Sequence, residues 1–162
     1  MSTQVQATRR IDLLLAEYGE SHQNPTNKAI HWFAVPVIAW SVIAILWALP
    51  TPGFFADASY LNWATIVCAL AVGYYLTLSI PLAIGMAAFS LIAIAIIRLL
   101  EDTVSIKLEW IAGTLFVFAW AFQFAGHEVE GKKPSFFKDL QFLLIGPAWL
   151  MHFLFRRLGI PY

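Results

Sequence analysis

The sequence is short of charge and of cysteine. Asp, Glu, Lys and Arg make up only 12% of its 162 residues, whereas a soluble domain usually carries about twice that fraction. Positive and negative side chains balance to a formal net charge of zero, which excludes the basic surface expected of a nucleic-acid-binding protein. The single cysteine, Cys68, excludes an intramolecular disulfide. Because Cys68 lies inside an apolar run, we interpret it as a small packing residue.

Hydrophobic side chains are abundant instead. They form 60% of the chain, and the mean hydropathy is +0.71. This composition predicts an integral membrane protein, and the length leaves no room for a helical bundle plus a separate soluble module. We therefore expect a single membrane-embedded domain over residues 1–162. Charged residues are scattered through the first 28 positions, so no cleavable signal peptide is predicted.

Four apolar runs are candidates for transmembrane helices, since a helix needs roughly 20 apolar residues to cross a bilayer. They cover residues 30–49, 60–78, 82–100 and 110–125. Residues 8–20 have amphipathic spacing and predict a helix lying at the membrane surface. Residues 140–155 are apolar but short, and Gly146-Pro147 interrupts them, so we interpret them as re-entrant or interfacial. The predicted fold is an all-α membrane bundle of about four transmembrane helices, with short amphipathic or re-entrant helices at its termini.

The distribution of Lys and Arg predicts the orientation of this bundle. These residues lie before the first apolar run and after the fourth, whereas residues 50–59 contain none and residues 98–109 contain two. The positive-inside rule then places both termini in the cytosol. The membrane would be a bacterial inner membrane, or the endoplasmic reticulum of a eukaryote. Residues 21–27 are loop-like, and we expect Thr26 or Asn27 to cap the helix that follows.

Three of the four histidines stand at the edges of apolar runs. His22 and His31 precede or open the first run, and His127 follows the fourth. An even number of crossings puts all three on the same face, which the charge distribution makes cytosolic. Imidazole groups at such positions need polar partners or a metal. The sequence therefore predicts a metal site assembled from both ends of the chain, although a single interfacial histidine is commonly a hydrogen-bonded anchor.

Other polar residues accompany these histidines. Glu130 lies three residues after His127 and shares its helix face if the fourth helix continues; it can bind the metal or accept a ring N–H of a histidine, and we predict the second. Asn27 and Gln123 are either hydrogen-bond donors supporting the ligands or simple caps. His152 is either a fourth ligand or a histidine of the core or of the ligands' surroundings. The sequence contains neither HExxH nor the repeated histidine boxes of membrane desaturases.

Two segments resemble the motifs of the Mpo1-like family. The first is Tyr18-Gly-Glu-Ser-His22, followed by Asn27, His31 and Pro36. The second is Gln123-Phe-Ala-Gly-His127, followed by Glu130-Gly-Lys-Lys-Pro-Ser135 and Gly146-Pro147. The resemblance covers nearly the whole chain.

The resemblance implies an Fe(II)-dependent dioxygenase that shortens 2-hydroxy fatty acids by one carbon in fatty acid α-oxidation. It implies that His22, His31 and His127 carry this activity, and that a 2-hydroxy fatty acid, dioxygen and membrane lipid are the partners. The rival hypothesis is a non-catalytic membrane scaffold, or a lipid- or metal-binding protein, with structural histidines. A metal-dependent lipid hydrolase or hydroxylase lies between the two. The sequence predicts no oligomeric state.

Overall fold

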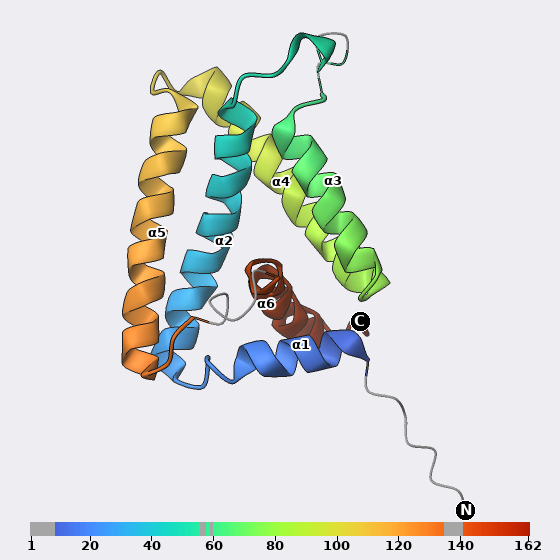
Figure 1. The fold of residues 1–162 in the computed structure, drawn as a ribbon, viewed down its shortest axis with the longest axis vertical. Helices are drawn as coiled ribbons and strands as arrows, with labels where there is room; N and C mark the ends of the chain where they lie inside the picture. The colour runs from blue at the N-terminus through green and yellow to red at the C-terminus, as the bar shows by residue number, and fades with distance from the viewer. Residues whose placement is uncertain (1–8, 56–57, 59, 135–140) are drawn as a thin grey trace, which may run out of the picture.

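The computed structural model describes residues 9–55, 58, 60–134 and 141–162, in which helices are joined by turns and loops and no strand occurs (Figure 1). The elements are α1 (Arg10–Gly19), α2 (Pro25–Ala48), the 3-10 helix η1 (Gly53–Phe55), α3 (Trp63–Leu76), α4 (Ile80–Thr103), α5 (Leu108–Glu130) and α6 (Phe142–Leu158). Three of them, α2, α4 and α5, are long and apolar enough to cross a membrane. The all-α membrane fold predicted from the sequence is confirmed.

The second predicted span is shorter than expected. Helix α3 has 14 residues, which at 1.5 Å per residue gives about 21 Å, less than the roughly 30 Å of a hydrocarbon core. Asn62 and Thr65 form a reciprocal capping box at its start, so the residues before Trp63 turn away from the helix. Helix α3 runs beside α4, and a tight turn at Ser79 joins them (Figure 1).

Helices α2 and α5 both extend further toward the histidines than the apolar runs indicated. Helix α2 begins at Pro25, where the missing N–H costs nothing in a first turn. Its cap is Asn24, whose side chain accepts a hydrogen bond from the Thr26 amide at 2.8 Å; the prediction of Thr26 or Asn27 as cap was wrong. Helix α5 continues to Glu130 and ends at Gly131, which has a φ of 70°. This left-handed conformation suits glycine and terminates the helix.

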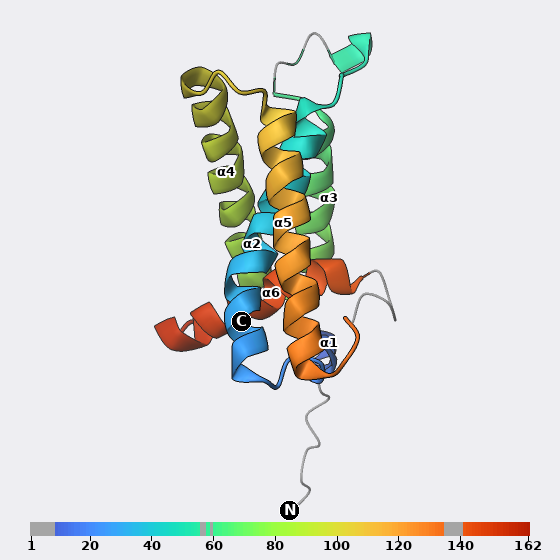
Figure 2. The ribbon, with the colours of Figure 1, turned by 90° about the vertical axis from the view of Figure 1, so that its left-hand side faces the viewer.

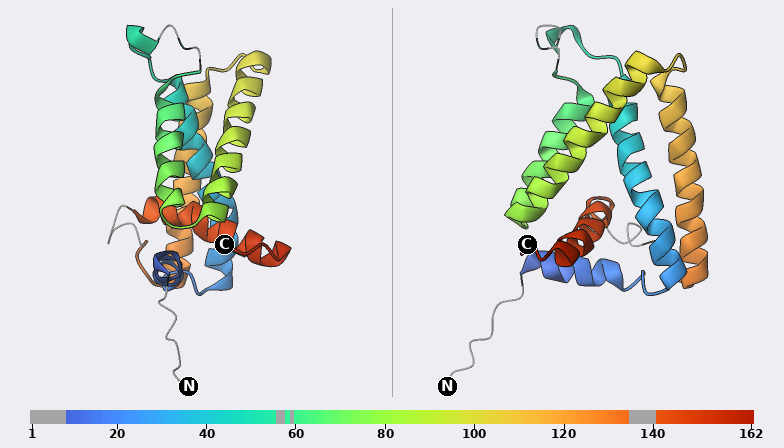
Figure 3. Two further views of the ribbon diagram at one scale, coloured as in Figure 1. Left: turned by 90° about the vertical axis from the view of Figure 1, so that its right-hand side faces the viewer. Right: turned by 180° about the vertical axis from the view of Figure 1, so that it is seen from behind.

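The helices form two pairs that diverge from each other. Helices α2 and α5 pack side by side along their length, and α3 and α4 form the second pair (Figures 1 and 2). Helices α1 and α6 lie across one end of the bundle (Figures 1 and 3). The start of α2 and the end of α5 lie at this same end, and the connection from α2 to α3 lies at the opposite end (Figure 1).

Helix α6 is continuous, with Pro147 inside it, so the predicted interruption at Gly146-Pro147 does not break the helix. Its buried side chains pack against those of α1 in one cluster that includes Ile11, Leu14, Ile145 and Trp149. The amphipathic face of α1 is therefore covered by α6. With 17 residues, α6 is not among the helices that could span, in agreement with the interfacial interpretation.

Candidate metal centre

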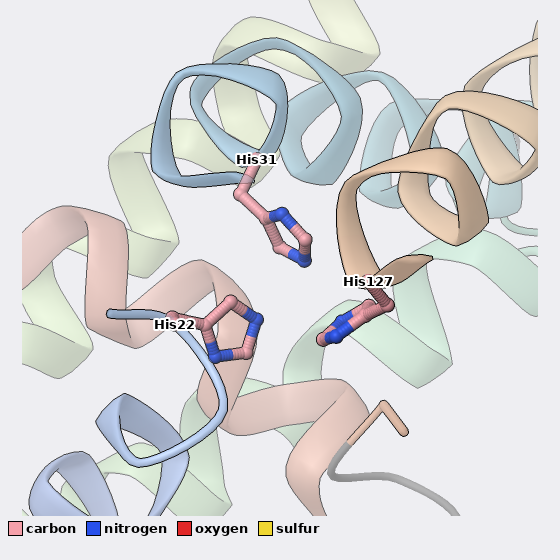
Figure 4. Close-up of side chains that lie close together, drawn as sticks. All are labelled: His22, His31 and His127. Atoms are coloured by element: carbon pink, nitrogen blue, oxygen red, sulfur yellow. The ribbon is translucent and has the colours of Figure 1, made fainter. Parts of the chain in front are cut away.

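Three histidines from three segments meet at the end of the bundle where α1 and α6 lie. His22 follows α1, His31 lies in the second turn of α2, and His127 lies in the last turn of α5 (Figure 4). One ring nitrogen of each lies within 4.8 Å of the others. The three side chains are 1%, 0% and 4% exposed, respectively. The structure thus brings together the three histidines that the sequence assigned to one face.

Hydrogen bonds to the backbone fix the rings of two of these histidines. The Nδ1 of His22 lies 2.6 Å from the carbonyl oxygen of Tyr18, and the Nδ1 of His31 lies 2.9 Å from that of Asn27. A carbonyl only accepts, so each Nδ1 carries the proton and each Nε2 keeps a free lone pair. The Nε2 atoms of His22 and His31 and the Nδ1 of His127 are buried with no hydrogen-bond partner in the described structure. Buried polar atoms are rarely left unpaired, so three of them facing one point form a ready ligand set.

The surroundings keep His22 neutral and oriented. Burial lowers the pKa of His22 to about 4, and a metal ligand must be unprotonated. The ring of Tyr18 stacks on the His22 ring with centroids 4.2 Å apart and planes 11° apart. The indole of Trp149 approaches from α6 with a centroid separation of 5.2 Å. The sequence analysis did not identify this supporting role of Tyr18 and Trp149, although Tyr18 precedes His22 by four residues.

Glu130 fastens the loop that carries His22 to the start of α2. Its Oε1 accepts the Gln23 amide at 2.7 Å, and its Oε2 accepts the Asn24 amide at 2.8 Å and the Asn27 Nδ2 at 3.0 Å. The sequence predicted that Glu130 accepts a ring N–H of a histidine, but the ring N–H groups of His22 and His31 go to backbone carbonyls. Glu130 therefore positions the ligand-bearing segments through Asn27 and the loop backbone.

Asn27 and Gly126 mark the closest approach of α2 and α5 beside the histidines. The Nδ2 of Asn27 also donates to the Ser21 carbonyl at 3.2 Å. A Cβ placed on Gly126 would lie 2.5 Å from the Oδ1 of Asn27, closer than any real contact allows. The sequence analysis quoted Gly126 within a motif but gave it no role. In the sequence, only the position of Gly126 directly before His127 indicated a role for it.

Gln123 and His152 have different places. Gln123 lies one turn before His127 on the same face of α5; it is 6% exposed, and its Oε1 has no partner among the described residues. His152 does not join the histidine cluster within the described chain. Its Nδ1 faces the Trp149 carbonyl at 3.1 Å, and its ring lies against Phe153 and Tyr162. Helix α6 presents Trp149 to the cluster, whereas His152, one turn later, packs in the core. The structure therefore does not support the prediction that His152 is a fourth ligand.

An apolar cavity of about 440 Å³ begins beside His127 and extends into the bundle. Its lining includes His127, Gln123 and Tyr18 at one end, and aliphatic and aromatic side chains of α2, α3, α4 and α5 beyond them. A second, more polar hollow is lined by His127, Lys132, Lys133 and Pro134, among others. His127 and Pro134 line both spaces, so the candidate centre stands between a polar surface and an apolar interior.

A comparison with protein families shows where this chain belongs. The family described as "2-hydroxy-palmitic acid dioxygenase Mpo1-like" matches residues 9–158. The chain belongs to the Mpo1-like family. This Mpo1-like protein is 29% identical, over 145 residues, to the 2-hydroxy-palmitic acid dioxygenase MPO1 of Saccharomyces cerevisiae, with 88% of this chain and 78% of the yeast protein covered. No solved structure matches the Mpo1-like chain. The family match extends from α1 to the end of α6 and so includes every residue of the histidine cluster.

Proposed function

We propose that this protein is an Fe(II)-dependent dioxygenase that shortens 2-hydroxy fatty acids by one carbon. The observation that carries the proposal is the convergence of three unpartnered, buried histidine nitrogens, beside an apolar cavity that His127 lines. Membership of the Mpo1-like family and similarity to a named dioxygenase support the reaction class.

The donor set fits a transition metal of this kind. Neutral imidazole suits iron, zinc, copper and nickel alike, so the three histidines favour a metal without selecting one. The relation to a dioxygenase favours iron. When bound, Fe(II) would supply the activation of dioxygen that the oxidation requires. We assign His22, His31 and His127 as its ligands, with their ring orientations fixed by Tyr18, Asn27 and the α5 terminus.

The proposed reaction balances without a further reductant. A 2-hydroxy acid and one molecule of dioxygen give the acid one carbon shorter, carbon dioxide and water. The bond between the carboxyl carbon and the hydroxyl-bearing carbon breaks, and the latter is oxidised to the new carboxyl group. The electrons lost by these two carbons equal those that reduce dioxygen. The protein's part is to place this bond beside the histidines and to exclude water.

The two spaces that meet at His127 suit the two ends of such a substrate. The apolar cavity receives the hydrocarbon chain, which comes from membrane lipid. The unpartnered Oε1 of Gln123 can accept a hydrogen bond from the 2-hydroxyl group. Lys133 lines the polar hollow and offers a positive charge to the carboxylate. Lys132 lines it too, but its Nζ already donates to the Glu20 carbonyl at 2.7 Å. The positive-inside rule places this site at the cytosolic face, in a bacterial inner membrane or the endoplasmic reticulum.

Metal loading and oxygen uptake test the proposal. The detergent-purified protein is loaded with Fe(II) without air, and then given dioxygen with a 2-hydroxy fatty acid or, as control, with the non-hydroxylated acid of the same length. We expect one bound iron per chain and one dioxygen consumed per shortened acid, with no uptake for the control. A protein that binds no metal supports the scaffold with structural histidines. A protein that binds metal but consumes no dioxygen supports a lipid- or metal-binding role.

A further inference from the structure

The apolar cavity has two chemically different ends. At one end lie His127 and Gln123, each of which carries an unpartnered polar atom. At the other end the outermost lining residues come from four helices: Ile43 of α2, Val67 and Cys68 of α3, Ser90 of α4 and Phe116 of α5. The cavity thus runs lengthwise inside the bundle, from the candidate metal centre toward the opposite face of the membrane.

The hydroxyl groups that line the cavity beyond Gln123 are already engaged in hydrogen bonds. The hydroxyl of Ser90 donates to the Met86 carbonyl within its own helix at 2.9 Å. The Tyr75 hydroxyl of α3, which also lines the cavity, donates to the Leu144 carbonyl at 2.6 Å. A polar group at the end of a bound chain would lose its water here without compensation. The occupant that fits is an unbranched hydrocarbon chain ending in a methyl group.

The helix rise gives the length of this space. Along α5 the lining extends from His127 to Phe116, eleven residues, or about 16 Å at 1.5 Å per residue. A fully extended chain of single bonds advances about 1.2 Å per bond, as the protein backbone shows. The cavity therefore accommodates about 14 bonds between the hydroxyl-bearing carbon at the histidines and the terminal methyl group. That is the length of a saturated acid of about 16 carbons.

We infer that Cys68, Ser90 and Phe116 form the end wall that limits the chain length of the bound fatty acid. The inference rests on the proposed function for the identity of the head group, and on the cavity alone for the chain. Acids up to this length bind with their whole chain enclosed. Each methylene beyond it has to bend or leave the cavity, and each buried methylene is worth roughly a fourfold change in affinity.

The experiment shortens the cavity and measures affinity across a homologous series. The variants are Cys68→Phe and Ser90→Leu. The controls are Leu70→Phe and Leu91→Phe on the same two helices, at side chains that are each 69% exposed. Straight-chain 2-hydroxy acids bracketing the derived length are the substrates, and the corresponding non-hydroxylated acids are the binding probes. Iron content and melting temperature of each variant verify that it has folded.

For the two cavity variants, we expect the chain length that binds most tightly to shift to shorter acids. A chain made too long by two methylenes should lose about fifteenfold in affinity, while clearly shorter acids and both control variants keep wild-type values. Phe116→Ala should extend the optimum in the opposite direction. A folded variant that weakens all lengths equally, or leaves the optimum unchanged, overturns the inference. The two hypotheses fail separately: a shifted binding optimum without turnover refutes only the proposed reaction, and turnover with an unshifted optimum refutes only the end wall.

Discussion

Gly126 and Asn27 touch so closely that no side chain fits between them: a Cβ on Gly126 would lie 2.5 Å from the Asn27 Oδ1. This contact determines how near the end of α5 comes to the start of α2. His127 follows Gly126 directly, and His31 lies one turn after Asn27, with its Nδ1 on the Asn27 carbonyl. The distance between two candidate ligands therefore depends on a residue without a side chain.

Gly126→Ala should damage the candidate metal site more than the fold. The added methyl group must displace Asn27, and overpacking of this kind costs about 1–3 kcal/mol. We expect metal affinity to fall by about 10- to 100-fold, as it does when groups that orient ligands are lost. The matched control is Gly113→Ala on the same helix, where a Cβ meets nothing within 4 Å. Metal titration measures the affinity of both variants. Equal affinities would contradict the role given to the contact between Gly126 and Asn27.

The sequence predicted the all-α fold and the convergence of three histidines, because hydropathy and charge patterns act over whole segments. The number of crossings stays a prediction, since three helices are long and apolar enough to span. The sequence could not show what depends on contacts between distant residues. Glu130 binds the backbone of Gln23, which lies 107 positions away, and no spacing rule reveals such a pair. For His152 the sequence left a ligand and a core histidine as alternatives, and only the packing of α6, which places Trp149 at the cluster, separates them. The cavity likewise arises only when six helices pack together.

The variants His31→Ala and His152→Ala should differ sharply in iron affinity. His31 presents an unpartnered Nε2 to the cluster, whereas His152 packs against Phe153 and Tyr162. Removing a direct ligand should lower iron affinity by more than the roughly 100-fold that orienting groups can account for. His152→Ala should keep stoichiometric iron and lose only packing energy. Iron analysis after gel filtration measures both, and loss of iron in His152→Ala would restore it as a ligand.

Glu130→Gln should weaken iron binding without abolishing it. An amide keeps one acceptor oxygen but turns an N–H₂ group toward amides that also donate, so the bonds to Gln23 and Asn24 cannot both survive. We expect iron affinity and turnover to fall by about 10- to 100-fold. Both should fall further in Glu130→Ala. Glu128→Gln on the exposed side of the same turn is the control. Complete loss of iron in Glu130→Gln would mean that the carboxylate binds the metal directly.

The short length of α3 leads to a prediction about membrane topology. In the structure the chain passes along the bundle in α2, α3, α4 and α5 in alternating directions (Figure 1), and we therefore predict that α3 crosses the membrane although it has only 14 residues. A helix this short is accommodated by local thinning of the bilayer or by residues flanking it, at a modest cost. Both termini then lie on one side, and the connection after α2 lies on the other.

Single-cysteine labelling tests this arrangement, because Cys68 is the only native thiol. In a Cys68→Ala background, Thr51→Cys and Lys107→Cys should react with a membrane-impermeant maleimide added outside intact cells or right-side-out vesicles. Lys133→Cys should react only after the membrane is opened, since it lies beside His127 at the other end. All three positions are exposed, so unequal labelling reports sidedness. If Thr51→Cys and Lys107→Cys label from opposite sides, α3 and α4 do not both cross. The cluster of His22, His31 and His127 would then be drawn from segments on different faces, which the proposed site does not allow.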